Sequence, residues 1–305
     1  MNDRPSDTTL ATKPHLVSPP EWTSAIRPSV DAALDAFIDR AEMPDSLRAA
    51  VRYAATSGGK RVRPILSWAC SEAVGGLGEA SLPAGVAVEL IHAFSLVHDD
   101  LPSLDDDDLR RGRPTLHRHA GEAMAVLAGD AMLTLAFQAI DAIDTPTLRD
   151  RLRDDLVRGT MGMIGGQVYD TLGTLPEGLT DREKLETVHR GKTGALLKAS
   201  CLMGARCGGA DNRSLQAVSD YAESIGLLFQ IVDDLIDVEQ SDEHVGKRTG
   251  KDADAGKRTY PGVLGIKASR TAADDFLESA CRAARGLAKH ERLEGFARYL
   301  RVRTK

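Results

Sequence analysis

Two acidic stretches of this 305-residue chain hold residues whose types and spacing suit metal-assisted chemistry. Aspartate fills six of the ten positions 99–108, and a second acidic run occupies residues 233–237. Each run directly follows an apolar segment, where an unpaired charge is unfavourable, so each needs a compensating cation. Carboxylates without clustered cysteine or histidine favour Mg²⁺ over zinc, and Mg²⁺ held in this way usually shares its coordination shell with substrate phosphates. The neighbouring Arg110 and Arg111 suit a phosphate as well.

Spacing adds detail to both stretches. In a helix, Asp233 and Asp237 lie four residues apart and therefore on one face. Asp99 and Asp105 are six apart, which at ~100° per residue would place them on different faces of a continuous helix. Pro102 cannot continue a regular helix, so we expect a break that brings Asp105 back towards Asp99. The alternative for either run is a solvated acidic face, but two runs behind apolar segments favour the metal site.

Glycines and cations meet in a third segment, Gly-Gly-Lys-Arg-Val-Arg-Pro at residues 58–64. Glycines let the backbone approach a ligand, and three cations at the start of a helix offer an anion site. A polar turn that caps a helix is the alternative. His92 lies seven residues before Asp99, nearly two turns, so it shares that face and can donate to a phosphate oxygen unless it is a satisfied core residue.

Two further basic segments are better explained by a functional role than by a structural one. Lys192 and Thr193 are flanked by glycines inside an otherwise apolar helix, where an ammonium group needs an anion or a carboxylate. Residues 246–261 are glycine-rich and basic, and we interpret them as a mobile loop that folds over a phosphate as a lid.

Composition favours a helical cytoplasmic protein. Hydrophobic residues make up 42% of the chain and aromatic residues only 4%, which favours helices over a sheet sandwich. A net charge of −6 argues against a nucleic-acid partner. The four cysteines form no CxxC pair, as expected of reduced thiols in the cytosol. No signal peptide and no run of eighteen apolar residues is evident, so membrane insertion is not expected.

The periodicity predicts an all-α fold. Residues 1–20 lack apolar periodicity and are expected to form a disordered leader, and residues 21–305 a single-domain bundle of roughly ten or more helices around a central cavity. No alternation typical of strands persists. One helix is expected to run from 148 to 164 and to close at the glycines that follow. Residues 123–143 are apolar almost all round, which predicts a helix at the centre of the bundle in which Asp130 is buried.

Five motifs, in their order along the chain, resemble those of the trans-isoprenyl diphosphate synthases, or polyprenyl synthetases. The motifs are Gly-Gly-Lys-Arg-Val-Arg-Pro at 58–64, Asp-Asp-x4-Asp ending in Arg-Arg-Gly at 99–112, Gly-Gln at 166–167, Lys-Thr-Gly at 192–194 and Gln-Ile-Val-Asp-Asp-x2-Asp at 230–237. The resemblance runs from about residue 30 to the C-terminus. The Leu101-Pro102 expansion of the first aspartate motif makes it closest to the bacterial farnesyl diphosphate synthases.

This resemblance implies a role for each matching residue. About three Mg²⁺ ions would grip an allylic diphosphate, with Asp99, Asp105 and Asp233 as ligands and Asp100, Asp234 and Asp237 nearby. The same diphosphate would be contacted by Arg110, Lys192 and Lys247, helped by Lys257. The diphosphate of isopentenyl diphosphate would be held by Lys60, Arg63, His92 and Arg111. Carbonyl and hydroxyl dipoles facing the carbocation would come from Thr193 and Gln230. The family resemblance also implies a homodimer.

The implied reaction is head-to-tail prenyl transfer. The allylic C–O bond breaks heterolytically, the double bond of isopentenyl diphosphate attacks the cation, and a proton is lost to the released pyrophosphate. A chain growing along the helix that bears Asp99 meets Phe94, five residues earlier and ~7.5 Å along the axis, with the small Ser95 beside it. In the family an aromatic residue at this place stops growth at fifteen carbons, so farnesyl diphosphate is the expected product.

Three other functions share some of these features. A geranylgeranyl diphosphate synthase would share the chemistry but have a deeper pocket and a C20 product. A terpene cyclase also uses an aspartate-rich metal site but holds no second diphosphate, so Lys60, Arg63 and Arg111 would be superfluous. A non-catalytic bundle, such as an inactive regulatory subunit, would be expected to have an eroded aspartate motif, whereas both motifs are intact.

Overall fold

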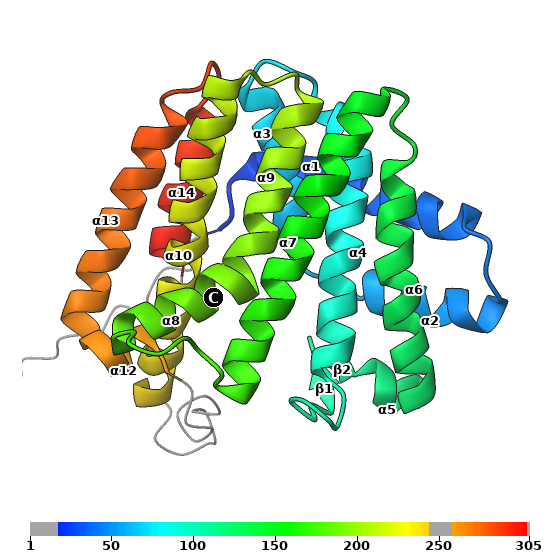
Figure 1. Cartoon of the computed structure of the whole chain (residues 1–305), viewed down its shortest axis with the longest axis horizontal. Coiled ribbons are helices and arrows are strands. Elements are labelled where there is room, and N and C mark those ends of the chain that lie inside the picture. The colour runs from blue at the N-terminus through cyan, green and yellow to red at the C-terminus, as the bar shows by residue number, and fades with distance from the viewer. Residues whose placement is uncertain (1–17, 244–257, 304–305) are drawn as a thin grey trace, which may run out of the picture.

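The computed structural model describes residues 18–243 and 258–303, and almost all of its regular structure is helical. Its longer helices stand side by side (Figure 1). The helices are α1 (Glu21–Arg40), α2 (Asp45–Ala55), α3 (Val62–Ala73), η1 (Gly78–Ser81), α4 (Leu82–Asp99), α5 (Leu116–Ala120), α6 (Glu122–Ile140), α7 (Pro146–Leu172), α8 (Asp181–His189), η2 (Arg190–Ala195), α9 (Leu196–Cys207), α10 (Asn212–Glu243), α12 (Tyr260–Leu264), α13 (Ile266–Ala284) and α14 (Glu291–Val302). The expected all-α fold is confirmed.

Apolar side chains form two main cores. One core gathers mainly residues of α1, α2, α4, α6 and α7, and the other mainly residues of α3, α9, α10, α13 and α14. The two cores meet where α3 contacts α4 and where α9 contacts α4 and α7. The C-terminal ends of α4 and α10, which carry the two acidic motifs, lie at the same end of the bundle, the lower end in Figure 1.

A short hairpin interrupts the helical pattern directly after the first acidic run. Strand β1 (Leu109–Arg110) pairs antiparallel with β2 (Arg113–Pro114). Arg111 and Gly112 at its tip have φ angles of 55° and 74°, as a tight hairpin turn of the I′ class requires. This hairpin is not predicted from the sequence, because strands of two residues are too short to show alternation. Its consequence is that Arg110 and Arg111 are held by a turn rather than by a flexible loop.

The prediction for residues 123–143 was wrong in its placement. Helix α6 forms there, but Val126 is 41% exposed, Leu127 is 57% exposed and Asp130 is also exposed. One face of α6 packs on α4 while the opposite face looks outward. An apolar face on the outside of a bundle gives the same sequence pattern as a central helix. The central helix is α4, in which Ala84–Ile91 is buried without interruption.

Helix α7 is longer than predicted. It continues through Gly165 and Gly166 and ends at Leu172, where Gly173 adopts a left-handed φ of 66°. Paired glycines usually weaken a helix, which is why the predicted end lies at residue 164. Here they are tolerated because η2 packs directly on them, as described below.

Two helical stretches are long and apolar enough to cross a membrane by length and composition, Gly78–Asp99 and Glu122–Ile140. Within the bundle, 67% of the first and 44% of the second is buried. The core helices of globular proteins pass the same test, so these two stretches are weak evidence of membrane insertion.

Candidate active site

The first acidic motif begins where α4 ends. Asp105 donates its backbone N–H to the carbonyl of Asp99 at 2.9 Å, and Leu104 donates to Leu101 at 2.9 Å. The chain therefore turns back on itself around Pro102, so the predicted break is confirmed. The two carboxylates are close enough that the charge of Asp105 raises the pKa of Asp99.

Burial dominates the electrostatics of Asp99. Loss of hydration raises its pKa to about 6, the ammonium group of Lys192 opposes this rise, and Asp105 adds to it. No residue in the described part of the chain donates a hydrogen bond to this carboxylate. A half-buried carboxylate in this state is stabilised by a cation, which is what a metal ligand requires.

The raised pKa predicts that Asp99 destabilises the metal-free protein at neutral pH. Its pKa is about 6 when folded and about 3.9 when unfolded, so the folded state binds more protons between these values and stability falls as pH rises through this window. Asp99→Asn should therefore raise the free energy of unfolding at pH 7.5 by about 1–2 kcal/mol, after a discount for partial exposure. The gain should vanish below about pH 4. Denaturant unfolding in EDTA at several pH values measures it, and a pH-independent difference would contradict it.

Asp100 binds the side chain of Arg110. The Arg110 Nε donates to both Asp100 oxygens at 2.8 and 2.9 Å, and Nη2 donates to Oδ1 at 2.5 Å. Asp100 is only 2% exposed. Burial raises its pKa, and the hydrogen bonds from Arg110 oppose that rise. In this geometry Asp100 orients the guanidinium group rather than offering its oxygens to a metal.

The second acidic motif lies on α10. Arg303 donates from Nη2 to Asp233 Oδ1 at 2.7 Å and to the Phe229 carbonyl at 3.0 Å. Burial raises the pKa of Asp233, Arg303 lowers it, and the charge of Asp237 raises it, as expected of carboxylates one turn apart. Arg303 is not among the predicted site residues, since nothing in the sequence places the C-terminal segment against residue 233.

Asp234, which lies between Asp233 and Asp237 in the sequence, has a different environment. It is 8% exposed, and its Oδ2 accepts the backbone N–H of Tyr260 at 2.8 Å. His189 Nε2 lies 3.8 Å from the same oxygen, and its ring stacks on the Tyr260 ring at 5.6 Å. Burial lowers the pKa of His189 to about 4. Asp234 therefore anchors the first residue of α12.

A π-helix, η2, presents the residues predicted to act on the substrate. Lys192 donates from Nζ to Asp170 Oδ2 at 2.6 Å, and Thr193 donates from Oγ1 to Gln230 Oε1 at 2.9 Å. Segments of π-helix occur often at functional sites because the extra residue re-aims side chains. Through these contacts η2 connects α7 and α10, and Lys192 also acts on Asp99.

Close backbone contact fixes this π-helix on α7. A Cβ added to Gly166 would lie 2.0 Å from the backbone nitrogen of Lys192, and one added to Gly191 would lie 2.7 Å from the Gly166 Cα. Only glycine permits this approach. The Gly-Gln motif therefore positions Lys192 through its backbone.

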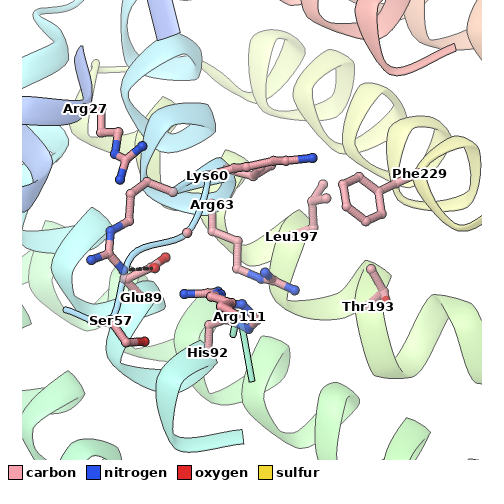
Figure 2. Close-up of a pocket in the computed structure, with 13 residues that line it drawn as sticks. Arg27, Ser57, Lys60, Arg63, Glu89, His92, Arg111, Thr193, Leu197 and Phe229 are labelled. Carbon is pink, nitrogen blue, oxygen red and sulfur yellow. Dashed lines mark hydrogen bonds and ion pairs between the residues drawn. The ribbon is translucent and has the colours of Figure 1, made fainter. Parts of the chain in front are cut away.

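A cavity of about 620 Å³ opens beside η2, and cations line much of it. Figure 2 shows the guanidinium groups of Arg63 and Arg111 gathered beside His92, with Lys60 and Arg27 further round the cavity. Burial is the largest cause that lowers the pKa of Lys60, Arg63, Arg111 and His92, and neighbouring cations lower all four further. A bound polyanion would stabilise this cationic wall of the cavity, formed by Lys60, Arg63 and Arg111. The neutral imidazole of His92 keeps one N–H that can donate to the same anion.

Arg61 supports this wall from behind. Its backbone is left-handed, with φ of 49°, and its side chain is buried. It donates to Glu89 at 2.6 Å, to Asp31 at 2.7 Å and to the Ala55 carbonyl at 2.8 Å. Arg61 is one of the three cations predicted to bind an anion, but the structure shows that its charge is neutralised inside the protein. Its three contacts instead fix the loop that carries Lys60.

The glycines of this segment admit Arg111. Gly59 has φ of 119°, and a Cβ there would lie 2.5 Å from Arg111 Nη1. Arg111 donates to the Gly58 carbonyl. The hairpin and the basic segment are thus in direct contact, and the Arg111 side chain runs along the bare backbone as expected for paired glycines.

A second cavity of about 440 Å³ adjoins the first and is largely apolar. It shares Arg63, His92 and Thr193 with the cationic cavity. The predicted chain-length residues, Phe94 and Ser95, both line it. Its other wall is α7, through Met163, Ile164, Gln167, Val168, Thr171 and Leu172. Its volume lies in the range typical of small-molecule sites.

The structure thus brings most of the predicted site residues to one region. Arg27 on α1 also lines the cationic cavity, and it could not be predicted because it lies outside every motif. The predicted ligands Lys247 and Lys257 lie outside the described residues.

The donor set fits Mg²⁺ shared with a phosphate ligand. Across residues 18–238 and 258–303, no three acidic, histidine or cysteine side chains converge closely enough to hold a metal ion by themselves. An ion at Asp99 and Asp105, or at Asp233 and Asp237, would complete its shell with water and substrate oxygens, which is how Mg²⁺ is usually bound. The half-buried Asp99 carboxylate, with a raised pKa and no hydrogen-bond donor in the described structure, supports this fit.

Comparison with known proteins identifies the family. The family model described as polyprenyl synthetase matches residues 44–296. The chain is 44% identical over 261 residues to a farnesyl diphosphate synthase of Geobacillus stearothermophilus, covering 83% of this chain and 87% of that protein. It is 43% identical over 273 residues to geranylgeranyl pyrophosphate synthase 7 of Arabidopsis thaliana, a chloroplastic protein, covering 88% of this chain and 76% of that protein. A solved FPP/GFPP synthase of Zymomonas mobilis matches with a TM-score of 0.79 at 33% identity, covering 92% of this chain and 97% of that one. The chain belongs to the polyprenyl synthetase family and is a trans-prenyltransferase.

Proposed function

We propose that this prenyltransferase condenses isopentenyl diphosphate with dimethylallyl and then geranyl diphosphate, giving farnesyl diphosphate and pyrophosphate. The observation that carries the proposal is the pair of adjoining cavities, one lined by cations and one largely apolar with Phe94 in its wall. Relatives named for farnesyl and for geranylgeranyl products are both similar to this chain, so product length is argued from Phe94 alone.

In this proposal the acidic motifs hold Mg²⁺ and the allylic diphosphate. Asp99 and Asp105 on one side and Asp233 with Asp237 on the other would hold the ions, which when bound supply positive charge to the departing pyrophosphate. Asp100 would contribute by orienting Arg110, to which it is hydrogen-bonded. Asp234 would contribute by anchoring α12 through its hydrogen bond with Tyr260.

Side chains of the protein would stabilise the remaining charges of the reaction. Lys192 and Arg110 would neutralise negative charge on the allylic diphosphate, together with the predicted ligands Lys247 and Lys257. The oxygens of Thr193 and Gln230 would lie beside the allylic cation and stabilise its charge. Apolar walls in the second cavity exclude water, which would otherwise capture the cation.

The cationic cavity would take isopentenyl diphosphate, which contributes the nucleophilic double bond. Lys60, Arg63, Arg111 and a neutral His92 would grip its diphosphate, and we add Arg27 on the same cavity wall. This second diphosphate site is what distinguishes coupling from cyclisation, because a cyclase binds one diphosphate only.

A product assay tests the proposed function. Purified protein with Mg²⁺ and radiolabelled isopentenyl diphosphate is offered dimethylallyl, geranyl or farnesyl diphosphate in turn, and products are separated by chromatography. We expect farnesyl diphosphate from the first two and little elongation of the third. Strong elongation of farnesyl diphosphate would favour the C20 alternative, and a cyclic hydrocarbon from a single diphosphate would favour a cyclase.

Loss of the Arg111 charge should weaken binding of isopentenyl diphosphate selectively. Asparagine tolerates the left-handed backbone at this position, so Arg111→Asn removes the charge without adding strain. A lost charge-assisted hydrogen bond should raise KM for isopentenyl diphosphate about 10- to 100-fold, with a much smaller change for the allylic substrate. Steady-state kinetics measure both. Arg113→Asn is the matched control, since Arg113 lies over the Tyr53 ring. An equal rise in KM for both substrates would contradict the assignment of Arg111 to the isopentenyl diphosphate site.

We further propose that residues 21–305 fold as one domain and that two copies form a homodimer in the cytoplasm. Apolar side chains are exposed on α6 and α7, among them Leu127 (57% exposed), Val157 (44%) and Met161 (61%). They support the surface formed by α6 and α7 as the contact with the second copy. The four cysteines are all unpaired, as expected of a reducing compartment. Sedimentation of the purified protein tests the dimer.

A further inference from the structure

His98 separates the apolar cavity from helix α6. One turn beyond Phe94 on α4, its side chain lines the cavity of about 440 Å³. On its other side, the imidazole Nε2 lies 3.2 Å from the Val126 carbonyl of α6. The ring therefore belongs to the cavity wall and also to the α4–α6 contact.

The ring fits on α6 only because residue 129 is glycine. A Cβ at Gly129 would lie 2.0 Å from His98 Nε2, 2.5 Å from Cδ2 and 2.8 Å from Cε1. These distances are far below van der Waals contact, so any larger residue at 129 must displace the ring. Gly129 is in the middle of α6, where glycine disfavours the helix, so its presence has a packing reason.

His98 also contacts the residue that closes the cavity. The Phe94 and His98 rings meet edge to face, with centroids 5.1 Å apart and an interplanar angle of 80°. This arrangement is favourable for aromatic pairs. Phe94 is 8% exposed and belongs to the same apolar cluster as Ala125 and Ala128 of α6. With His98 seated on Gly129, the Phe94 ring is held towards the cavity.

We propose that His98, seated on Gly129, is a second determinant of product length that acts by holding Phe94 in place. The proposal rests on the prenyl transfer proposed above and concerns a shift relative to the wild-type product, whichever length that product has. His98 is a specificity-determining residue in this view and takes no part in bond breaking.

The contact predicts opposite effects for its two members. Gly129→Ala pushes the imidazole off α6 and into the cavity it lines, so the product distribution should shift to shorter chains. His98→Ala removes the ring, enlarges the cavity and frees Phe94 to move towards α6, so longer chains should appear. In the double variant the new methyl group meets no ring, so Gly129→Ala should no longer shorten the product.

Product analysis of the four proteins tests this. Isopentenyl and dimethylallyl diphosphate are supplied with Mg²⁺, and the ratio of longer to shorter products is measured at low conversion. We expect each single variant to move the ratio about tenfold or more, in opposite directions, because a pocket discriminates by this much per small group. The double variant should resemble His98→Ala.

Controls separate this proposal from the proposed function. Gly295→Ala, a glycine in α14 with open space around it, should leave the ratio unchanged. The Mg²⁺ concentration for half-maximal rate should be unchanged in His98→Ala, although Asp99 is adjacent. If wild-type protein makes no condensation product, the proposed function fails. If wild type is active but His98→Ala keeps its product ratio, or the double variant still shortens the chain, this inference is overturned, even where Gly129→Ala alone proves unstable.

Discussion

Asp99→Asn is expected to lower kcat for prenyl transfer by about a thousandfold or more, while leaving the protein folded. A metal ion stabilises the departing diphosphate by several kcal/mol, and about 4 kcal/mol corresponds to a thousandfold in rate. Asparagine keeps the size of the side chain and removes its charge, so the geometry of the turn at Asp105 is retained. The measurement is kcat under saturating substrates across a wide range of Mg²⁺ concentrations.

The matched control is Asp106→Asn in the same acidic run. Asp106 is exposed, pairs with Arg118 at 3.3 Å and has φ of 47°, which asparagine tolerates. This variant should keep near-wild-type kcat. Because Asp99→Asn should also be more stable at neutral pH without metal, reduced activity cannot be attributed to unfolding. Equal loss of activity in both variants would indicate that the acidic run acts only through its overall charge.

Phe94→Ala is expected to shift the product from farnesyl diphosphate to longer chains. The ring of Phe94 lines the apolar cavity and lies about five residues, or ~7.5 Å, from Asp99 along α4. Its removal opens the space that a further isoprene unit needs. Chromatography of the products should then show C20 and longer diphosphates as the main species, a change of about tenfold or more in product ratio.

Phe137→Ala provides the comparison. Phe137 on α6 packs against the same core as a partly buried residue but does not line the cavity. It should lower stability without altering product length. An unchanged product length in Phe94→Ala would remove the argument for a C15 product and leave the prenyl transfer itself untouched.

Local sequence signals predicted the features that depend on short-range geometry. The helical fold followed from apolar periodicity, and the return of Asp105 to Asp99 followed from Pro102. The closeness of Asp233 and Asp237 followed from their spacing on one helix. In each case the cause lies within a few residues of its effect.

Features that depend on tertiary partners could not be predicted in this way. Arg61 has the same sequence context as Lys60 and Arg63, but only the fold places Glu89 and Asp31 beside it. Arg303 reaches Asp233 from 70 residues away in sequence. Asp130 is exposed because α6 lies at the outside of the bundle, which periodicity alone does not distinguish from the centre.

Close contacts between two helices could not be predicted from the sequence either. The π-helix at 190–195 depends on Gly166 of α7, and the seat of His98 depends on Gly129 of α6. Glycine in a helix signals some close approach, but the sequence does not say of what. These contacts decide where Lys192 and Phe94 point, so the finest determinants of the site are tertiary.

A crystal structure with Mg²⁺ and pyrophosphate tests the central claim most directly. We expect pyrophosphate between the ends of α4 and α10, with Mg²⁺ about 2.1 Å from carboxylate oxygens of Asp99 and Asp233. The Asp233–Arg303 contact should be exchanged for metal coordination. Pyrophosphate bound elsewhere, with both aspartate motifs free of metal, would contradict it.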